Sequence, residues 1–178
     1  MWKGIAMMIR QMELLRRTPG ALRALLEGLD EELLRTNCGG ETFSAFDILG
    51  HLIHGEQTDW LPRVEHILAH QNRKPFEPFD RFAMYELSRG RSTIELLDEF
   101  AALRTANLAR LEQLELGHGA LGLRGLHPAL GEVTMAQLLA SWVVHDLGHI
   151  AQIARTLAYP LKDEVGPWRE YLTILPRS

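Results

Sequence analysis

Residues 141–159 read SWVVHDLGHIAQIARTLAY and lie near the end of a chain of 178 residues. On an α-helix with about 3.6 residues per turn, a set of positions between 138 and 156 falls along one side. These positions hold Leu138, Trp142, His145, His149, Gln152, Ile153 and Thr156. Because this side begins apolar and turns polar halfway along, we predict one amphipathic helix with two histidines in its apolar stripe.

His145 and His149 are four residues apart, which places both imidazoles on one face of the helix. This spacing lets two rings reach one cation from a rigid backbone, as in zinc sites with histidines at i and i+4. The alternative is a pair of core histidines held by hydrogen bonds, because a buried imidazole costs free energy unless it finds a partner. The pair predicts two ligands of a metal site, and a third ligand from elsewhere would favour the metal.

Length and composition predict a single globular domain that spans residues 1–178. The chain is 46% hydrophobic and 24% charged, with a net charge of −4, so it does not resemble a disordered protein. No basic run with interleaved aromatic residues occurs, so nucleic acid is not an expected partner. Residues 1–17 lack the apolar core of a signal peptide, and no later run reaches the roughly 18 apolar residues of a membrane span. We therefore expect a cytoplasmic protein with no membrane partner, and Cys38, the single cysteine, excludes an internal disulfide.

Helical periodicity and capping signals predict four main helices. A stripe with spacings of three and four covers residues 2–17. Thr18 and Pro19 then predict the start of a second helical piece, either kinked from the first or separate. Pro62 predicts a kink near residues 59–60 in the next helix. Three capping boxes pair Ser44 with Asp47, Ser92 with Glu95 and Thr134 with Gln137, and open helices to about residues 71, 116 and 158.

The connecting segments show no clear periodicity. Residues 72–91 contain two prolines and scattered aromatic residues, which predicts a long crossover loop. Residues 117–131 are rich in glycine and predict a turn region or a short hairpin. With no convincing strand elsewhere, the sequence predicts an all-α, four-helix bundle. The C-terminal segment is expected to pack back on this bundle through Trp168, Leu172 and Leu175.

A third metal ligand should come from a helix that faces residues 134–158, because sites in bundles are built from facing helices. His51 and His54 are the candidates. Both fall between two apolar sides of their helix, so periodicity does not choose between them. His66 and His70 lie past the predicted kink, beside polar residues, and are expected on a solvated face.

Two segments together resemble the DinB superfamily of metal-binding four-helix bundles: GHLIHGEQTDW, residues 50–60, and HDLGHIAQ, residues 145–152. The similarity extends over nearly the whole chain. It implies a three-histidine site made by His51, His145 and His149. Neutral imidazoles suit Zn, Ni, Fe or Mn, and ligand type alone does not rank these metals.

The resemblance implies a metal-dependent enzyme that acts on a small molecule, since members include thiol S-transferases that use low-molecular-weight thiols such as bacillithiol or mycothiol. Three protein ligands leave a coordination position open for such a thiol. The candidates for binding this cofactor are Arg63, Gln152 and His54. Metal-dependent hydrolysis is the alternative, although Asp146 stands where H-E-x-x-H peptidases have glutamate. A non-catalytic, stress-linked metal-binding bundle is a third possibility.

Two further expectations concern the surroundings of the site and the assembly. For Asp47 and Asp146, one interpretation is that the carboxylate accepts the outer N–H of a ligand histidine and so fixes its tautomer. The alternative for each is a surface carboxylate, and for Asp47 a helix cap. The predicted helix 44–71 is apolar on two sides, which requires burial within the bundle or against a second subunit. Together with the resemblance, this pattern predicts a homodimer.

Overall fold

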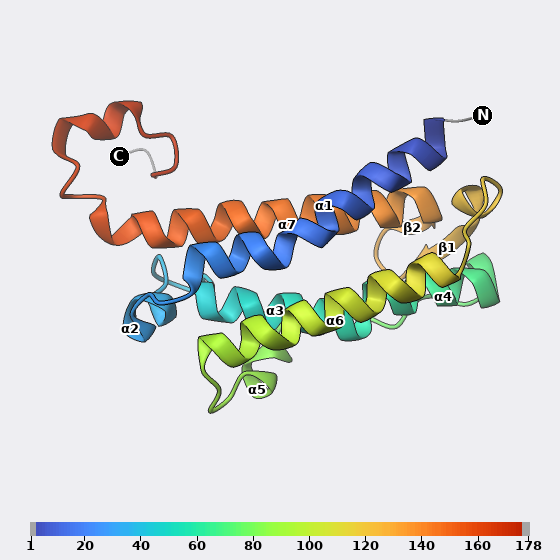
Figure 1. Cartoon of the computed structure of the whole chain (residues 1–178), viewed down its shortest axis with the longest axis horizontal. Helices are drawn as coiled ribbons and strands as arrows, with labels where there is room; N and C mark the ends of the chain where they lie inside the picture. Colours follow the sequence, from blue (N-terminus) through green and yellow to red (C-terminus); the bar gives the residue numbers. More distant parts are fainter. Residues whose placement is uncertain (1–2, 176–178) are drawn as a thin grey trace.

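The computed structural model describes residues 3–175, so residue 2 of the predicted first helix and both ends of the predicted domain 1–178 lie outside the described part. Five long or medium helices run roughly along one direction in this part of the chain (Figure 1). They are α1 (Lys3–Leu26), α3 (Ala45–Thr58), α4 (Trp60–His70), α6 (Thr93–Gln113) and α7 (Met135–Ala158).

The helices form a bundle in which α3 and α4 act as one broken column. α1 packs against α6 and α7, and α3 packs against the same two helices (Figure 1). This confirms the predicted all-α, four-helix bundle. The smaller elements are α2 (Glu31–Arg35), α5 (Met84–Leu87), β1 (Arg124–His127), β2 (Gly131–Thr134), and 3₁₀ turns at Gln71–Arg73, Ala120–Gly122, Tyr159–Leu161 and Gly166–Tyr171.

All three predicted capping boxes begin helices where the sequence placed them. In each box, the side chain of the cap residue accepts a hydrogen bond from the backbone N–H three residues later. The side chain at that later position accepts in turn from the backbone N–H of the cap residue, which is Ser44, Ser92 or Thr134. The predicted break at Pro62 is also confirmed, because α3 ends at Thr58 and α4 begins at Trp60.

The first helix differs from the prediction, because α1 continues through Pro19 without a separate second piece. Thr18 does not cap a helix, and its Oγ1 donates to the carbonyl of Leu14 at 3.4 Å. Pro19 has no N–H, so the carbonyl of Leu15 lacks its usual partner within the helix. Arg104 Nη1 donates to this carbonyl at 2.8 Å, which compensates for the proline.

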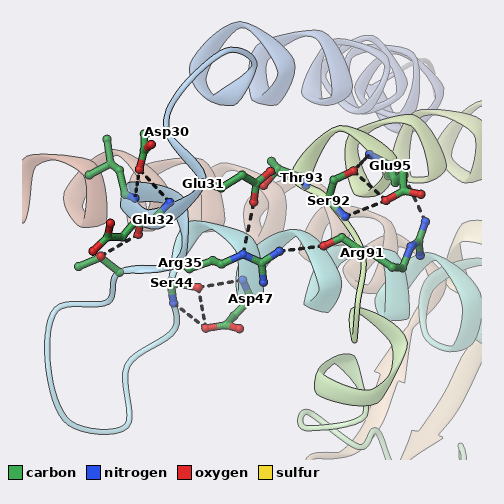
Figure 2. Close-up of polar contacts among 12 residues, drawn as sticks. Asp30, Glu31, Glu32, Arg35, Ser44, Asp47, Arg91, Ser92, Thr93 and Glu95 are labelled. Atoms are coloured by element: carbon green, nitrogen blue, oxygen red, sulfur yellow. Dashed lines mark hydrogen bonds and ion pairs between the residues drawn. The ribbon is translucent and has the colours of Figure 1, made fainter.

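Polar contacts tie α2 to the start of α6 (Figure 2). Glu31 Oε1 accepts from the backbone N–H of Thr93 at 2.9 Å, and Arg35 donates to the carbonyl of Arg91 at 2.8 Å. The Arg35 guanidinium also lies 3.7 Å from the ring centroid of Phe46, at the start of α3. These contacts close the end of the bundle near the crossover.

One expectation about the connecting segments is corrected, because residues 72–91, predicted as a loop, contain the short helix α5. Residues 124–134 form an antiparallel hairpin, which confirms the hairpin alternative predicted for residues 117–131 and extends three residues past them. Gly125 permits the hairpin to approach the bundle, since a Cβ there would lie 2.4 Å from Phe76 Cζ. At the C-terminus Leu175 is buried as predicted, whereas Trp168 is 72% exposed and Leu172 is 38% exposed.

The apolar core falls into two clusters along the bundle. One surrounds Trp60 and Trp142, and the other surrounds Phe100 and Ile153. Three charged residues are buried at the level between the two clusters: Arg104 on α6, Glu56 on α3 and Asp146 on α7. Among the described residues, no helix combines the length and apolarity that a membrane crossing requires.

Candidate metal centre

Three histidines from two helices converge midway along the bundle. His51 comes from α3, and His145 and His149 come from neighbouring turns of α7. Nε2 of His145 lies 3.1 Å from Nε2 of His51 and 3.0 Å from Nε2 of His149. One ligand atom from each ring lies within 4.8 Å of the other two. The structure therefore brings together the three residues that the sequence nominated.

The two helices position these rings in complementary ways. The spacing of four residues places His145 and His149 on one face of α7, which packs against α3. His51 is 8% exposed, whereas His145 and His149 are only partly buried.

The arrangement fits a divalent cation. In a tetrahedral zinc site with Zn–N distances of about 2.0–2.1 Å, two ligand nitrogens lie about 3.4 Å apart. The two observed separations are within a few tenths of an ångström of this spacing. Nε2 of His145 lies within hydrogen-bond distance of Nε2 in both other rings. One N–H on His145 cannot donate to two ring nitrogens, whereas one cation can bind the lone pairs of all three rings.

The outer nitrogens of the rings have unequal partners. His149 Nδ1 lies 3.0 Å from Gln152 Oε1, so its N–H can donate to the amide and leave Nε2 free to bind a metal. The Nδ1 atoms of His51 and His145 are buried without a hydrogen-bond partner among residues 3–175. Neither Asp47 nor Asp146 holds a ligand. Asp47 caps α3, as its alternative predicted, and Asp146 is buried and bonds to Arg104, so it is not a surface carboxylate.

Burial lowers the pKa of all three rings. The pKa of His51 falls to about 4 and that of His145 to about 3, first because burial disfavours the charged form and then because His149 lies close to both. The pKa of His149 is also lowered by burial, although Gln152 and the charge of Asp146 act in the opposite direction. The rings are therefore neutral at pH 7, which is the form that binds a metal.

The metal-free protein should lose stability as the pH falls below about 6.5, the pKa of histidine in the unfolded chain. Between this pH and the lowered pKa values of His51 and His145, the unfolded chain binds protons that the folded chain does not. Each ring that stays neutral in the folded chain would contribute up to about 1.4 kcal/mol per pH unit. Chemical denaturation in chelator at three pH values measures the slope, which His51→Leu should reduce. A free energy of unfolding that rises on acidification would contradict this expectation.

A buried ion-pair network lies behind the histidines, and sequence reasoning missed it. Arg104 donates to Glu56 Oε1 at 2.8 Å and to Asp146 Oδ2 at 2.7 Å. Trp142 Nε1 donates to Glu56 Oε1 at 3.0 Å, and Asn107 donates to Glu56 Oε2 at 3.0 Å. The network ties α3, α6 and α7 together at the level of the metal centre. The signal in the sequence was an arginine on the apolar stripe of residues 92–116.

The other nominated residues lie outside the cluster. His54 is half-buried with its ring 4.8 Å from that of Phe79, and it is not a member of the three-histidine group. Arg63 forms an ion pair with Asp59 at 2.6 Å, and only 11% of its side chain is exposed. His66 and His70 were both expected on a solvated face. His70 is exposed, whereas His66 is partly buried, with its ring against the carbonyl of Lys74.

Aromatic rings line the region around the histidines. The ring of Phe79, from the crossover segment, lies 5.4 Å from the His51 ring in an edge-to-face arrangement. Phe43 lies 6.1 Å from the same ring, and Trp60 lies 5.0 Å from the ring of His145. The metal centre is therefore surrounded by apolar surface on several sides, which lowers the local dielectric and limits solvent access.

Comparisons with known proteins agree with the four-helix bundle fold. The solved structure of YfiT from Bacillus subtilis is similar, with a TM-score of 0.73 and 20% sequence identity over 86% of this chain and 87% of that one. YfiT is described as a probable metal-dependent hydrolase with an unusual four-helix bundle topology. No curated protein matches the chain. A family model of the DinB superfamily matches residues 14–153, which is most of the sequence. The chain belongs to the DinB superfamily.

Proposed function

We propose that this protein is a metal-dependent enzyme whose His51, His145 and His149 hold one divalent cation, of the group Zn, Ni, Fe and Mn. The observation that carries the proposal is the convergence of three Nε2 atoms, two pairs of them 3.0–3.1 Å apart, in a half-buried site. Three protein ligands leave a position for a substrate atom, as catalytic metal sites do.

The reaction we propose is transfer of a low-molecular-weight thiol to an electrophile. A cation held by the three rings would lower the pKa of a thiol or water at the open position and so supply a nucleophile at neutral pH. In the transfer, sulfur forms a bond to the electrophilic carbon, the leaving group departs with its bonding electron pair, and the thiol proton passes to solvent. His149 is held for this role by Gln152, and the rings of Phe79 and Trp60 exclude water.

The neighbouring carboxylates favour a thiol over a water nucleophile. Asp146, next to His145 in the sequence, and Glu56, five residues after His51, both accept hydrogen bonds from buried Arg104. Asp59 is paired with Arg63 in the same way. A hydrolase gains from a free general base beside the water, whereas a thiol bound to a cation loses its proton without one.

Metal-dependent hydrolysis is the second candidate, and the description of YfiT supports it. The third possibility is a bundle in which the metal only stabilises the fold. Neither alternative changes the ligand set. The domain is proposed to include all of residues 1–178, and substrates are proposed to be small molecules.

The homodimer also remains a prediction, which sedimentation of the purified protein would test. The two apolar sides of α3, which were one reason to expect a dimer, no longer require a second subunit. Residues on both sides, Phe46, Ile48 and Leu52, are buried within one chain. The bundle itself therefore accounts for the two-sided pattern.

The reactions can be separated with metal-loaded protein. We expect conjugation of monochlorobimane only in the presence of a biological thiol, at a rate above that of His145→Ala, which serves as the background control. A parallel panel of esters tests hydrolysis. Ester turnover without any thiol would contradict the transferase proposal in favour of hydrolysis. Bound metal with neither activity would support the stabilising role.

A further inference from the structure

The crossover segment between α4 and α5 passes close to the metal centre. Phe79, in this segment, contacts the rings of both His51 and His54, with centroids 5.4 and 4.8 Å away. Asp80 Oδ1 accepts from the backbone N–H of Phe82 at 2.9 Å, which stabilises the turn that follows. The intervening residue, Arg81, is exposed beside this edge of the site.

The Arg81 side chain is oriented by rings. Its guanidinium carbon lies 5.4 Å from the ring centroid of Phe43 and 5.0 Å from that of Phe82. Phe43 in turn lies 6.1 Å from the ring of His51.

Within residues 3–175, no ion pair includes Arg81, although the chain as a whole carries a net charge of −4. Stacking on rings leaves the N–H groups at the edge of a guanidinium free to bind an anion. Other arginines of this half of the bundle are already paired: Arg63 with Asp59, Arg89 with Glu86, and Arg91 with Glu99.

We propose that Arg81 binds a carboxylate of the small-molecule thiol, with Phe79 and Phe43 against its organic part and its sulfur directed to the three-histidine centre. The inference rests on the proposed function and defines its substrate class as acidic thiols. It also assigns thiol binding to Arg81 in place of Arg63, which the sequence nominated and which is paired with Asp59. Arg81 offers a planar pair of donors that matches a carboxylate, which lysine could reproduce only in charge.

The test is thiol binding to cobalt-loaded protein, followed through the visible absorption of the metal. The probes are 3-mercaptopropionate, 2-mercaptoethanol and cysteamine, which carry a negative, a neutral and a positive tail of similar length. We expect 3-mercaptopropionate to bind about tenfold tighter than 2-mercaptoethanol, as for one charged hydrogen-bonded contact, and cysteamine to bind most weakly. Arg81→Gln should remove this preference while leaving the affinity for 2-mercaptoethanol unchanged.

Two further variants sharpen the result. Arg81→Lys should retain part of the preference, and Arg89→Gln, which removes an exposed arginine already paired with Glu86, should retain all of it. If the Arg81→Gln protein still prefers 3-mercaptopropionate as strongly as the unmodified protein does, the inference is overturned while the metal centre stands. If cobalt does not bind the unmodified protein, the proposed function itself fails.

Discussion

Replacing His145 with alanine should abolish binding of a divalent cation. Its Nε2 lies between those of His51 and His149, so the substitution removes the central donor and leaves two rings on different helices. Loss of a residue that merely supports a ligand weakens metal binding about 10- to 100-fold, and loss of the ligand itself should exceed this. Metal content after dialysis against a competing chelator, measured by mass spectrometry, gives the result.

The controls separate this site from the other histidines of the chain. His51→Ala and His149→Ala should also empty the site. Substitution of His66, on α4, or of His118, in the glycine-rich segment 117–131, by alanine should leave the metal content unchanged. Unmodified protein should lose thermal stability when the metal is removed, since a ligand that binds only the folded state stabilises it. If His54→Ala empties the site and His51→Ala does not, the ligand assignment is wrong.

Replacing Arg104 with alanine should destabilise the fold by about 3–5 kcal/mol, the range for removing one partner of a buried ion pair. The substitution leaves the carboxylates of Glu56 and Asp146 buried without their counter-ion. It also removes the donor to the carbonyl of Leu15 that Pro19 leaves free. Chemical denaturation, with the slope checked for two-state behaviour, measures the loss.

Arg110→Ala is the matched control for Arg104. Arg110 lies on the same helix and pairs with Glu65 at 2.9 Å, but both side chains are about half exposed. Exposed ion pairs contribute about 0–1 kcal/mol, so this substitution should have little effect. Equal losses of stability in the two variants would show that the buried network does not hold the bundle together.

Local signals explain why most of the helices could be predicted from the sequence. A capping box requires only residues three positions apart, and all three predicted boxes, including Ser44 with Asp47, begin helices in the structure. The effect of Pro62 is equally local. Pro19 was misjudged because the donor that compensates for it, Arg104, lies 89 residues from Leu15 in the sequence.

The ligand set illustrates a second limit. His145 and His149 were clear from their spacing, but the choice of His51 over His54 required packing, since both lie between apolar sides of α3. In the structure the His51 ring turns to α7, and the His54 ring turns to Phe79. The DinB resemblance supplied this choice where periodicity could not.

Long-range polar contacts were the least predictable features. Arg104 finds Asp146 and Glu56 across 42 and 48 residues of sequence, and no local pattern identifies such partners. Arg81 lies in a segment without periodicity, so only the fold shows that it lies near the histidines. The short hairpin was predicted only as one of two alternatives, because strands of four residues give little alternation to detect.

The most direct test of the account is a crystal structure of the zinc-loaded protein with data collected on both sides of the zinc absorption edge. The predicted result is one anomalous peak inside the bundle, bonded at about 2.0–2.1 Å to Nε2 of His51, His145 and His149. A crystal with no peak there, or with zinc bound to other residues while these three rings stand apart, would contradict the account.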